Sequence, residues 1–182
     1  MPDPATAWHF LEQSDLIVPA ERIDAAIGRL ATEITSACAN DYPLLLTVMG
    51  GAVVFAGRLI PLLRFPLDID YLHATRYGNA TRGGGLEWRV EPPQGLAGRN
   101  VLLLDDILDG GQTLHAIRER LLGAGARSVR CAVLVEKVLA VDKPIKADFV
   151  GLQIPDRFVF GCGMDAKGFW RNLPEIRAIK EQ

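Results

Sequence analysis

The chain has 182 residues, which is enough for one domain with a sizeable hydrophobic core. Its net charge of −2 argues against a strongly electrostatic nucleic-acid surface, although it is compatible with a local basic patch, and we expect no nucleic-acid partner. The polar start of the chain does not resemble a signal peptide, no apolar run approaches the length of a membrane span, and three widely separated cysteines form no metal-binding pattern. These features predict a cytoplasmic protein with no membrane partner.

The first part of the chain is predicted to alternate between helices and strands. Apolar residues recur at helical spacing over 20–39, so a helix is expected to pack one face on the body of the protein. The apolar run 44–49 predicts a short buried strand that two glycines end, and a helix is expected over 52–63, with a kink or an early stop near Pro61. Alternating apolar and polar residues over 67–74 predict a half-buried strand.

The middle of the chain contains a segment with little to anchor it. Residues 75–85 include four glycines and almost no apolar side chain, which predicts flexibility. Residues 86–90 alternate again, so the two flanking strands are expected to pair as an arm. A third helix is predicted over 114–122, and the following apolar run 128–135 predicts another buried strand.

The last part of the chain is predicted to hold short strands over 149–154 and 158–160, followed by a short helix within 165–182. Taken together, the order of elements is strand, helix, strand, arm, strand, helix, strand. This order predicts an α/β fold with a mostly parallel sheet.

The most informative stretch is the apolar run 101–104 with the acids and glycines that follow it. The run has no alternation, which is typical of a parallel strand covered on both faces. Asp105 and Asp106 come at its carboxyl end, where ligands bind in open α/β sheets. Paired acids suit ribose hydroxyls or a divalent cation. An acid pair alone is equally well explained as a solvated strand end or a helix cap.

The loop that follows the acid pair has the features of an anion-binding loop, which favours a ligand site. Residues 109–113 offer backbone N–H groups, the Thr113 hydroxyl and the N-terminus of a helix, and this combination suits a phosphate. The segment lacks the GxxxxGK(S/T) pattern of the P-loop nucleoside triphosphatases.

The stretch 101–114 resembles the motif with which type I phosphoribosyltransferases bind phosphoribosyl pyrophosphate (PRPP). It has an apolar strand, two acids, two apolar residues, Asp, a small residue, Gly, any residue and Thr. The rest of the chain resembles the hypoxanthine-guanine phosphoribosyltransferase branch of that family. This likeness covers roughly residues 44–173 and includes Lys137, the segments 146–151 and 154–159, Gly161, Asp165 and Arg171.

The resemblance implies a type I phosphoribosyltransferase fold, with a twisted, mostly parallel sheet flanked by helices. Residues 1–182 would form a single domain with a core of about 44–140. Segments of about 1–19 and 148–182 would form a small hood, and 75–86 would be a flexible loop that closes over the active site.

The resemblance also implies purine salvage. The enzyme would transfer the 5-phosphoribosyl group of PRPP to hypoxanthine and/or guanine, giving IMP or GMP and pyrophosphate. Asp109 would be the catalytic acid/base near the purine N7. PRPP and the nucleotide would be bound by Asp105, Asp106, Asp109, Gly110, Gly111, Gln112 and Thr113.

Further residues are assigned to the base, the pyrophosphate and Mg²⁺ by the same resemblance. Lys137 would donate to the 6-oxo group, Phe158 would stack on the ring, and Arg157, Val159 and Asp165 would complete the base site. Met49, Gly50, Gly51 and Arg171 would bind pyrophosphate, although many relatives have a lysine at the position of Met49. The cofactor would be Mg²⁺, held by Asp105, Asp106 and Asp165.

Other interpretations stay open at this point. A nucleotide- or PRPP-sensing regulator of the same fold, non-catalytic or bifunctional, is the main alternative, and a receiver-type signalling domain would also place acids at a strand end. Xanthine or a pyrimidine would be alternative substrates. We expect a homodimer or homotetramer, with the apolar helix around Val53, Val54 and Phe55 as a contact.

Overall fold

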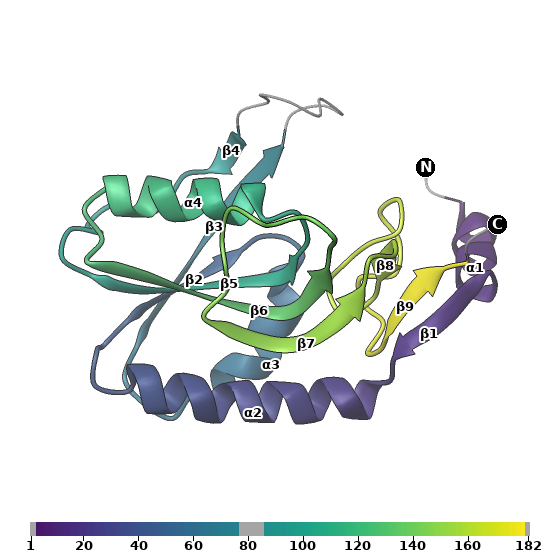
Figure 1. Ribbon diagram of the computed structural model, residues 1–182, viewed down its shortest axis with the longest axis horizontal. Helices are drawn as coiled ribbons and strands as arrows, with labels where there is room; N and C mark the ends of the chain where they lie inside the picture. The colour runs from purple at the N-terminus through teal and green to yellow at the C-terminus, as the bar shows by residue number, and fades with distance from the viewer. Residues whose placement is uncertain (1–2, 77–85, 181–182) are drawn as a thin grey trace.

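The computed structural model describes residues 3–76 and 86–180, and a six-stranded sheet forms its body (Figure 1). Strands β2, β3, β5, β6 and β7 are parallel, whereas β4 runs antiparallel to β3. This arrangement confirms the predicted mostly parallel sheet. The strands lie in the order β4 (Leu86–Val90), β3 (Asp68–Arg76), β2 (Leu44–Val48), β5 (Asn100–Leu108), β6 (Ser128–Val138) and β7 (Phe149–Pro155).

Helices cover both faces of this sheet (Figure 1). Helices α2 (Ala20–Cys38) and α3 (Ala52–Leu59) lie on one face, and α4 (Gln112–Gly123) lies on the other. Side chains of β5 alternate between the two cores: Leu102 and Leu104 pack with α2 and α3, while Leu103 packs with α4. The apolar run at 101–104 therefore shows no alternation, because both faces of β5 are buried.

A second, smaller sheet joins the two ends of the chain. Strands β1 (Ser14–Val18), β9 (Ile176–Ile179) and β8 (Val159–Phe160) pair antiparallel in the order β1, β9, β8. Figure 1 shows this sheet and helix α1 (Pro4–Glu12) beside one end of the large sheet, as a hood built from N- and C-terminal segments would lie.

One expectation for local structure needs correction, and another is confirmed. The predicted short helix near the end of the chain is wrong, because residues 176–179 are strand β9, which pairs with both β1 and β8. The early stop expected near Pro61 in the helix over 52–63 is confirmed: α3 ends at Leu59 and continues as a 3₁₀ turn, η1 (Ile60–Leu62), since Pro61 has no N–H to donate.

The arm expected around the glycine-rich segment is present at its base. Strands β3 and β4 pair antiparallel, with Arg76 opposite Leu86. Most of the predicted flexible loop 75–86, namely residues 77–85, lies outside the described residues. None of the helices in the described part of the chain has the length and apolar character that a membrane span requires.

Helix α1 holds the hood through aromatic side chains. Trp170 has a left-handed backbone with φ of 69°, which is uncommon for a bulky residue. Its indole Nε1 donates to the carbonyl oxygen of Ala7 at 2.6 Å, and its ring meets that of Trp8 edge-on at 5.0 Å. These contacts from α1 stabilise Trp170 in its strained conformation, directly before Arg171.

Trp170→Phe is expected to lower the free energy of unfolding by about 1 kcal/mol, because it removes the hydrogen bond to Ala7 and keeps an aromatic ring. Urea denaturation measures this change. Trp8→Phe is the matched control, since it leaves that hydrogen bond in place. Equal losses in the two variants would show that the indole N–H of Trp170 contributes nothing specific.

Candidate active site

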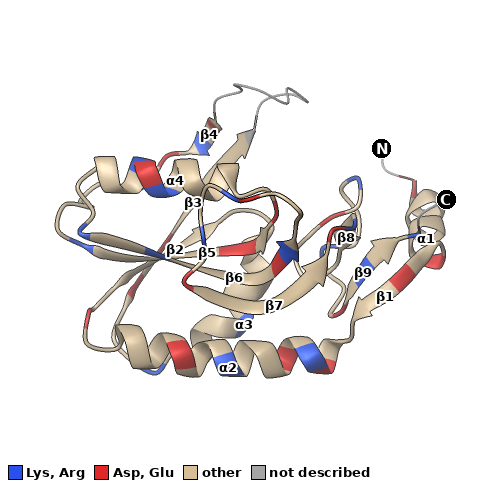
Figure 2. Cartoon of the chain, viewed as in Figure 1, with Lys and Arg blue, Asp and Glu red and all other residues tan. Residues whose placement is uncertain are grey.

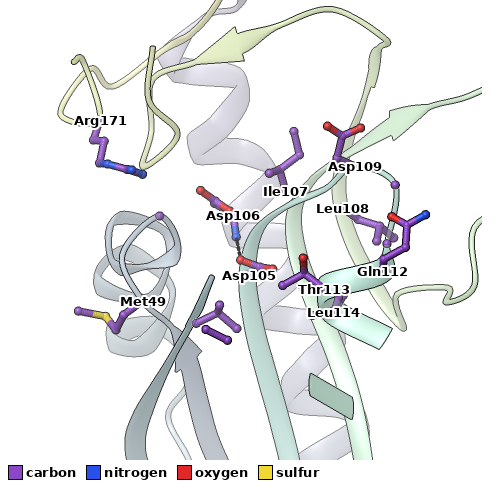
Figure 3. A pocket seen from close by; sticks show the side chains of 15 residues that line it. Met49, Asp105, Asp106, Ile107, Leu108, Asp109, Gln112, Thr113, Leu114 and Arg171 are labelled. Atoms are coloured by element: carbon purple, nitrogen blue, oxygen red, sulfur yellow. Dashed lines mark hydrogen bonds between the residues drawn. The ribbon is translucent and has the colours of Figure 1, made fainter. Parts of the chain in front are cut away.

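A cavity of about 590 Å³ lies at the carboxyl ends of the parallel strands β2 and β5 (Figure 3). Parallel pairing brings these strand ends to the same edge, so the residues that follow β2 face those that end β5. Acidic residues of β5 and the charged end of β6 also meet there (Figure 2). The site residues expected from sequence that line this cavity are Met49, Gly51, Asp105, Asp106, Asp109, Gly110, Gly111, Gln112, Thr113 and Arg171.

Asp105 and Asp106 form a hydrogen-bonded pair within the cavity. The backbone N–H of Asp106 donates to Oδ1 of Asp105 at 3.0 Å, and the Asp106 side chain is buried. Desolvation raises the pKa of Asp105 well above its ordinary value, and the neighbouring charge of Asp106 raises it further. Desolvation also raises the pKa of Asp106, although the positive charge of Arg171 opposes this change. Two buried like charges are therefore costly until a cation or a donor-rich ligand arrives.

Asp105→Asn is expected to stabilise the ligand-free protein, increasingly so as the pH rises. Because the folded-state pKa of Asp105 lies above its ordinary value of 3.8, the unfolded chain loses this proton first, and ionisation favours unfolding above that pH. Thermal unfolding in a chelator between about pH 4.5 and 8 measures the gain. A gain that does not change with pH, or a lower melting temperature than wild type, would contradict this account of Asp105.

The loop after the acid pair has the form of an anion site. Gly111 has a left-handed φ of 82° and directly precedes α4, whose first N–H groups have no partner within the helix. A Cβ at Gly111 would be strained and would also lie 3.2 Å from Cγ2 of Ile145, so glycine is required there. At Gly110 an added Cβ would meet only the movable amide end of Gln112, so alanine would fit after a rotamer change of that glutamine.

Lys137 and Asp109 are brought together by strand register. Leu108 of β5 is paired with Glu136 of β6, so the next residue of each strand lies beside the other. Lys137 Nζ lies 2.9 Å from Oδ2 of Asp109 and 3.6 Å from Oδ1 of Asp156. The lysine side chain is 10% exposed and that of Asp109 is 55% exposed, so a buried cation is presented beside an accessible carboxylate.

A second cavity of about 290 Å³ adjoins the first and has a partly apolar lining. Lys137, Phe158, Val159 and Asp165 all line it, as the sequence resemblance leads us to expect. Phe158 is 56% exposed, so its ring is available for stacking. The two cavities share residues of β5 and Arg171. The full lining of the second cavity is Asp106, Ile107, Asp109, Lys137, Phe158, Val159, Met164, Asp165 and Arg171.

Arg157, expected at the base, does not line this cavity, whereas Ile107 and Met164 line it without having been expected. The guanidinium of Arg157 does not line it; Nη2 of Arg157 donates to Asp15 and to the carbonyl oxygen of Ile179, so this side chain holds the hood strands together. Ile107 and Met164 line the cavity but were not singled out. Ile107 lies inside the recognised motif and Met164 directly precedes Asp165, so their positions in the sequence were the available signal.

Not all of the residues expected to bind pyrophosphate line the 590 Å³ cavity. Gly51 and Arg171 line the large cavity, and a Cβ at Gly51 would lie 1.8 Å from Oδ2 of Asp106. Gly50 is not among the lining residues. Met49 lines the cavity, but its side chain points away from Asp106 (Figure 3), and it also lines an apolar groove with Val53.

The acid pair suits Mg²⁺ more than it suits a metal that is held entirely by protein side chains. Mg²⁺ is usually held by one or two carboxylates and keeps waters and phosphate oxygens as its other ligands. Asp105 and Asp106 offer this donor set, and within residues 3–76 and 86–180 no group of three or more metal-binding side chains occurs. The third expected ligand, Asp165, is already engaged by the backbone N–H of Gly168 at 2.7 Å and by Nη2 of Arg171 at 2.5 Å.

Comparisons with known proteins agree with one another. The model of the phosphoribosyl transferase domain matches residues 14–167. The hypoxanthine-guanine phosphoribosyltransferase of Bacillus subtilis is 34% identical over 91% of this chain and 92% of that protein, and its Streptococcus pneumoniae counterpart is 31% identical over 92% and 93%. Among solved structures, a hypoxanthine phosphoribosyltransferase from Staphylococcus aureus has a TM-score of 0.87 at 25% identity, covering 98% of this chain and 97% of that one. A hypoxanthine-guanine phosphoribosyltransferase from Bacillus anthracis has a TM-score of 0.83 at 30% identity, covering 91% and 98%.

Proposed function

The chain belongs to the phosphoribosyl transferase domain family, and on that premise we propose that it is a purine-salvage enzyme, a hypoxanthine-guanine phosphoribosyltransferase. It transfers the 5-phosphoribosyl group of PRPP to hypoxanthine and/or guanine, and releases IMP or GMP and pyrophosphate. The observation that carries the proposal is the 2.9 Å contact between Asp109 and Lys137 at the boundary of the two cavities. One cavity has acids and an anion loop, and the other has an exposed aromatic ring.

Lys137 and Asp109 would act on opposite atoms of the purine. The Lys137 ammonium donates to the 6-oxo group, which accepts, whereas the amino group of adenine would offer only donors at that position. The accessible carboxylate of Asp109 holds or releases a proton at N7 as charge moves in the base. The apolar wall formed by Phe158, Ile107 and Met164 supports the ring between them.

Asp105, Asp106 and the anion loop would hold the phosphoribosyl group. The two carboxylates accept hydrogen bonds from the ribose hydroxyls, directly or through a bound cation. Residues 109–113 bind the 5′-phosphate with backbone N–H groups and the Thr113 hydroxyl. Because the anomeric carbon becomes positive as its bond to pyrophosphate breaks, nearby carboxylates stabilise it.

The pyrophosphate side is formed by Gly51 and Arg171, with Mg²⁺ as cofactor. When bound by Asp105 and Asp106, Mg²⁺ neutralises charge on the leaving pyrophosphate. Arg171 lies near enough to oppose the rise that burial causes in the pKa of Asp106, and so adds positive charge on this side. Asp165 would have to release Arg171 or Gly168 before it could bind a second Mg²⁺.

We also propose a homodimer or homotetramer in the cytoplasm. The three cysteines are free and buried, as expected in a reducing compartment. Of the three apolar residues expected at a subunit contact, Phe55 is fully buried and Val54 packs on the core, so Val53, which is 47% exposed, is the candidate that supports such a contact. Light scattering after size-exclusion chromatography gives the oligomeric state.

A spectrophotometric assay tests the function with Mg²⁺, PRPP and, in turn, hypoxanthine, guanine, xanthine, adenine and uracil. We expect turnover with hypoxanthine or guanine and none with adenine or uracil. Absence of turnover with every base, together with tight nucleotide binding, would contradict the enzyme proposal and favour a nucleotide-sensing regulator of the same fold.

A further inference from the structure

A nearly buried lysine lies behind the two residues that would act on the purine. Lys143 belongs to the connection between β6 and β7, and its side chain is 10% exposed. Its Nζ donates to the carbonyl oxygen of Lys137 at 2.6 Å, to that of Leu108 at 3.1 Å and to Oε1 of Glu136 at 3.2 Å. An ammonium has three N–H donors and no acceptor, so these three oxygens use its whole capacity.

The three oxygens belong to the two strand ends from which the site is built. Leu108 directly precedes Asp109, and Lys137 itself provides one of the carbonyl groups. The β5–β6 ladder ends at the pair Leu108 and Glu136, so the ammonium of Lys143 joins the strands at the point where their own pairing stops. Glu136 supplies the negative charge that offsets the cost of burying this cation.

The same connection supports the anion loop with its aliphatic part. A Cβ at Gly111 would lie 3.4 Å from Cβ of Lys143 and 3.2 Å from Cγ2 of Ile145, so both side chains pack closely behind that glycine. The aliphatic stem of Lys143 therefore contacts the anion loop, and its ammonium group contacts the ends of β5 and β6. These two contacts can be separated by mutation, because methionine keeps a stem of similar length and has no ammonium.

We infer that Lys143 is a positioning residue, which sets the distance between Asp109 and Lys137 without touching the substrate. The inference rests on the proposed function for its kinetic consequences. Catalytic groups must be held within a fraction of an ångström, and a misplacement of 1 Å costs about 100-fold in rate. The two carbonyl contacts fix the backbone on either side of the 2.9 Å pair, so their loss lets the pair separate.

Lys143→Met is expected to lower kcat/KM for hypoxanthine or guanine by about 10- to 100-fold. The KM for PRPP should change by less than about threefold, because the stem that supports Gly111 is kept. Lys146→Met is the matched control: it removes an exposed lysine from the same connection and should leave both constants at their wild-type values. A merely structural role for Lys143 predicts instead that both constants change together with the melting temperature.

A double-mutant cycle separates positioning from a general loss of stability. In an Asp109→Asn background the carboxylate placed by Lys143 is gone, so Lys143→Met should cost a clearly smaller factor there than in the wild type. The same factor in both backgrounds would overturn the inference. If Lys143→Met does not fold, Lys143→Gln takes its place, since the shorter amide side chain has only two N–H donors and cannot satisfy all three oxygens.

A crystal structure of Lys143→Met provides a test that needs no turnover. The distance between Asp109 Oδ2 and Lys137 Nζ should exceed the 2.9 Å found here, and an unchanged distance with unchanged kinetics would refute the role of Lys143. Wild-type protein that turns over none of the bases would refute the proposed function, and the crystallographic distance would still decide the question of positioning.

Discussion

Asp109→Asn is expected to lower kcat for nucleotide synthesis by about 10²- to 10⁴-fold, the usual contribution of a positioned acid/base. Asparagine has nearly the same shape but cannot take up and return a proton. PRPP binding should be largely spared, because the backbone N–H groups of residues 110–113 remain. Steady-state kinetics with guanine, together with calorimetric titration of PRPP and Mg²⁺, measure the two effects separately.

Asp156→Asn is the matched control for this experiment. Asp156 also faces Lys137, at 3.6 Å, and its side chain is 64% exposed, compared with 55% for Asp109. Both substitutions remove one negative charge beside the same lysine, but only Asp109 lines the cavities. Similar losses in the two variants would mean that charge balance at Lys137 matters and that Asp109 has no special part in proton transfer.

Gly51→Ala is expected to raise the KM for PRPP and lower kcat, with a loss in kcat/KM of about 10- to 100-fold. The new methyl carbon would lie 1.8 Å from Oδ2 and 2.6 Å from Cγ of Asp106, a separation that no two such atoms can keep. Asp106 is buried in β5, so it has little room to withdraw, and either the carboxylate or the loop 49–51 must shift. The contacts that position the ribose and those that position the pyrophosphate would therefore be disturbed together.

Gly57→Ala provides the comparison, because a Cβ at Gly57 would meet nothing within 4 Å. This glycine lies within α3, where alanine favours the helix by up to about 1 kcal/mol. Its variant should be fully active and at least as stable as the wild type. Full activity of Gly51→Ala in the same assay would show that the close approach to Asp106 is unimportant for the reaction.

The central part of the fold could be predicted from sequence because its evidence is local. The unbroken apolar run of β5 indicated a strand covered on both faces, and Leu102 and Leu103 indeed pack into opposite cores. The acids follow that strand directly, so their place at the cavity needed only the rule that parallel strands end at a common edge.

The hood and the supporting lysine could not be predicted in this way, because tertiary contacts decide them. Strand β9 has only four residues, and its partner β1 comes from the opposite end of the chain, so no local pattern announces the pairing. Lys143 lies between Asp142 and Pro144 in a segment typical of a solvated loop, yet it is nearly buried. Arg157 was assigned to the base by its neighbours in sequence, whereas its guanidinium reaches Asp15.

The pairing of β1 with β9 has a consequence for biosynthesis. During translation the residues of the anion loop and its acid pair leave the ribosome well before Ile176–Ile179, the last strand of the hood. Strand β8, which follows Phe158, pairs with β9, so the wall of the base cavity has no partner until residues 176–179 have been synthesised. A nascent or prematurely terminated chain would thus acquire the half of the site that holds phosphate and ribose before it could hold a purine.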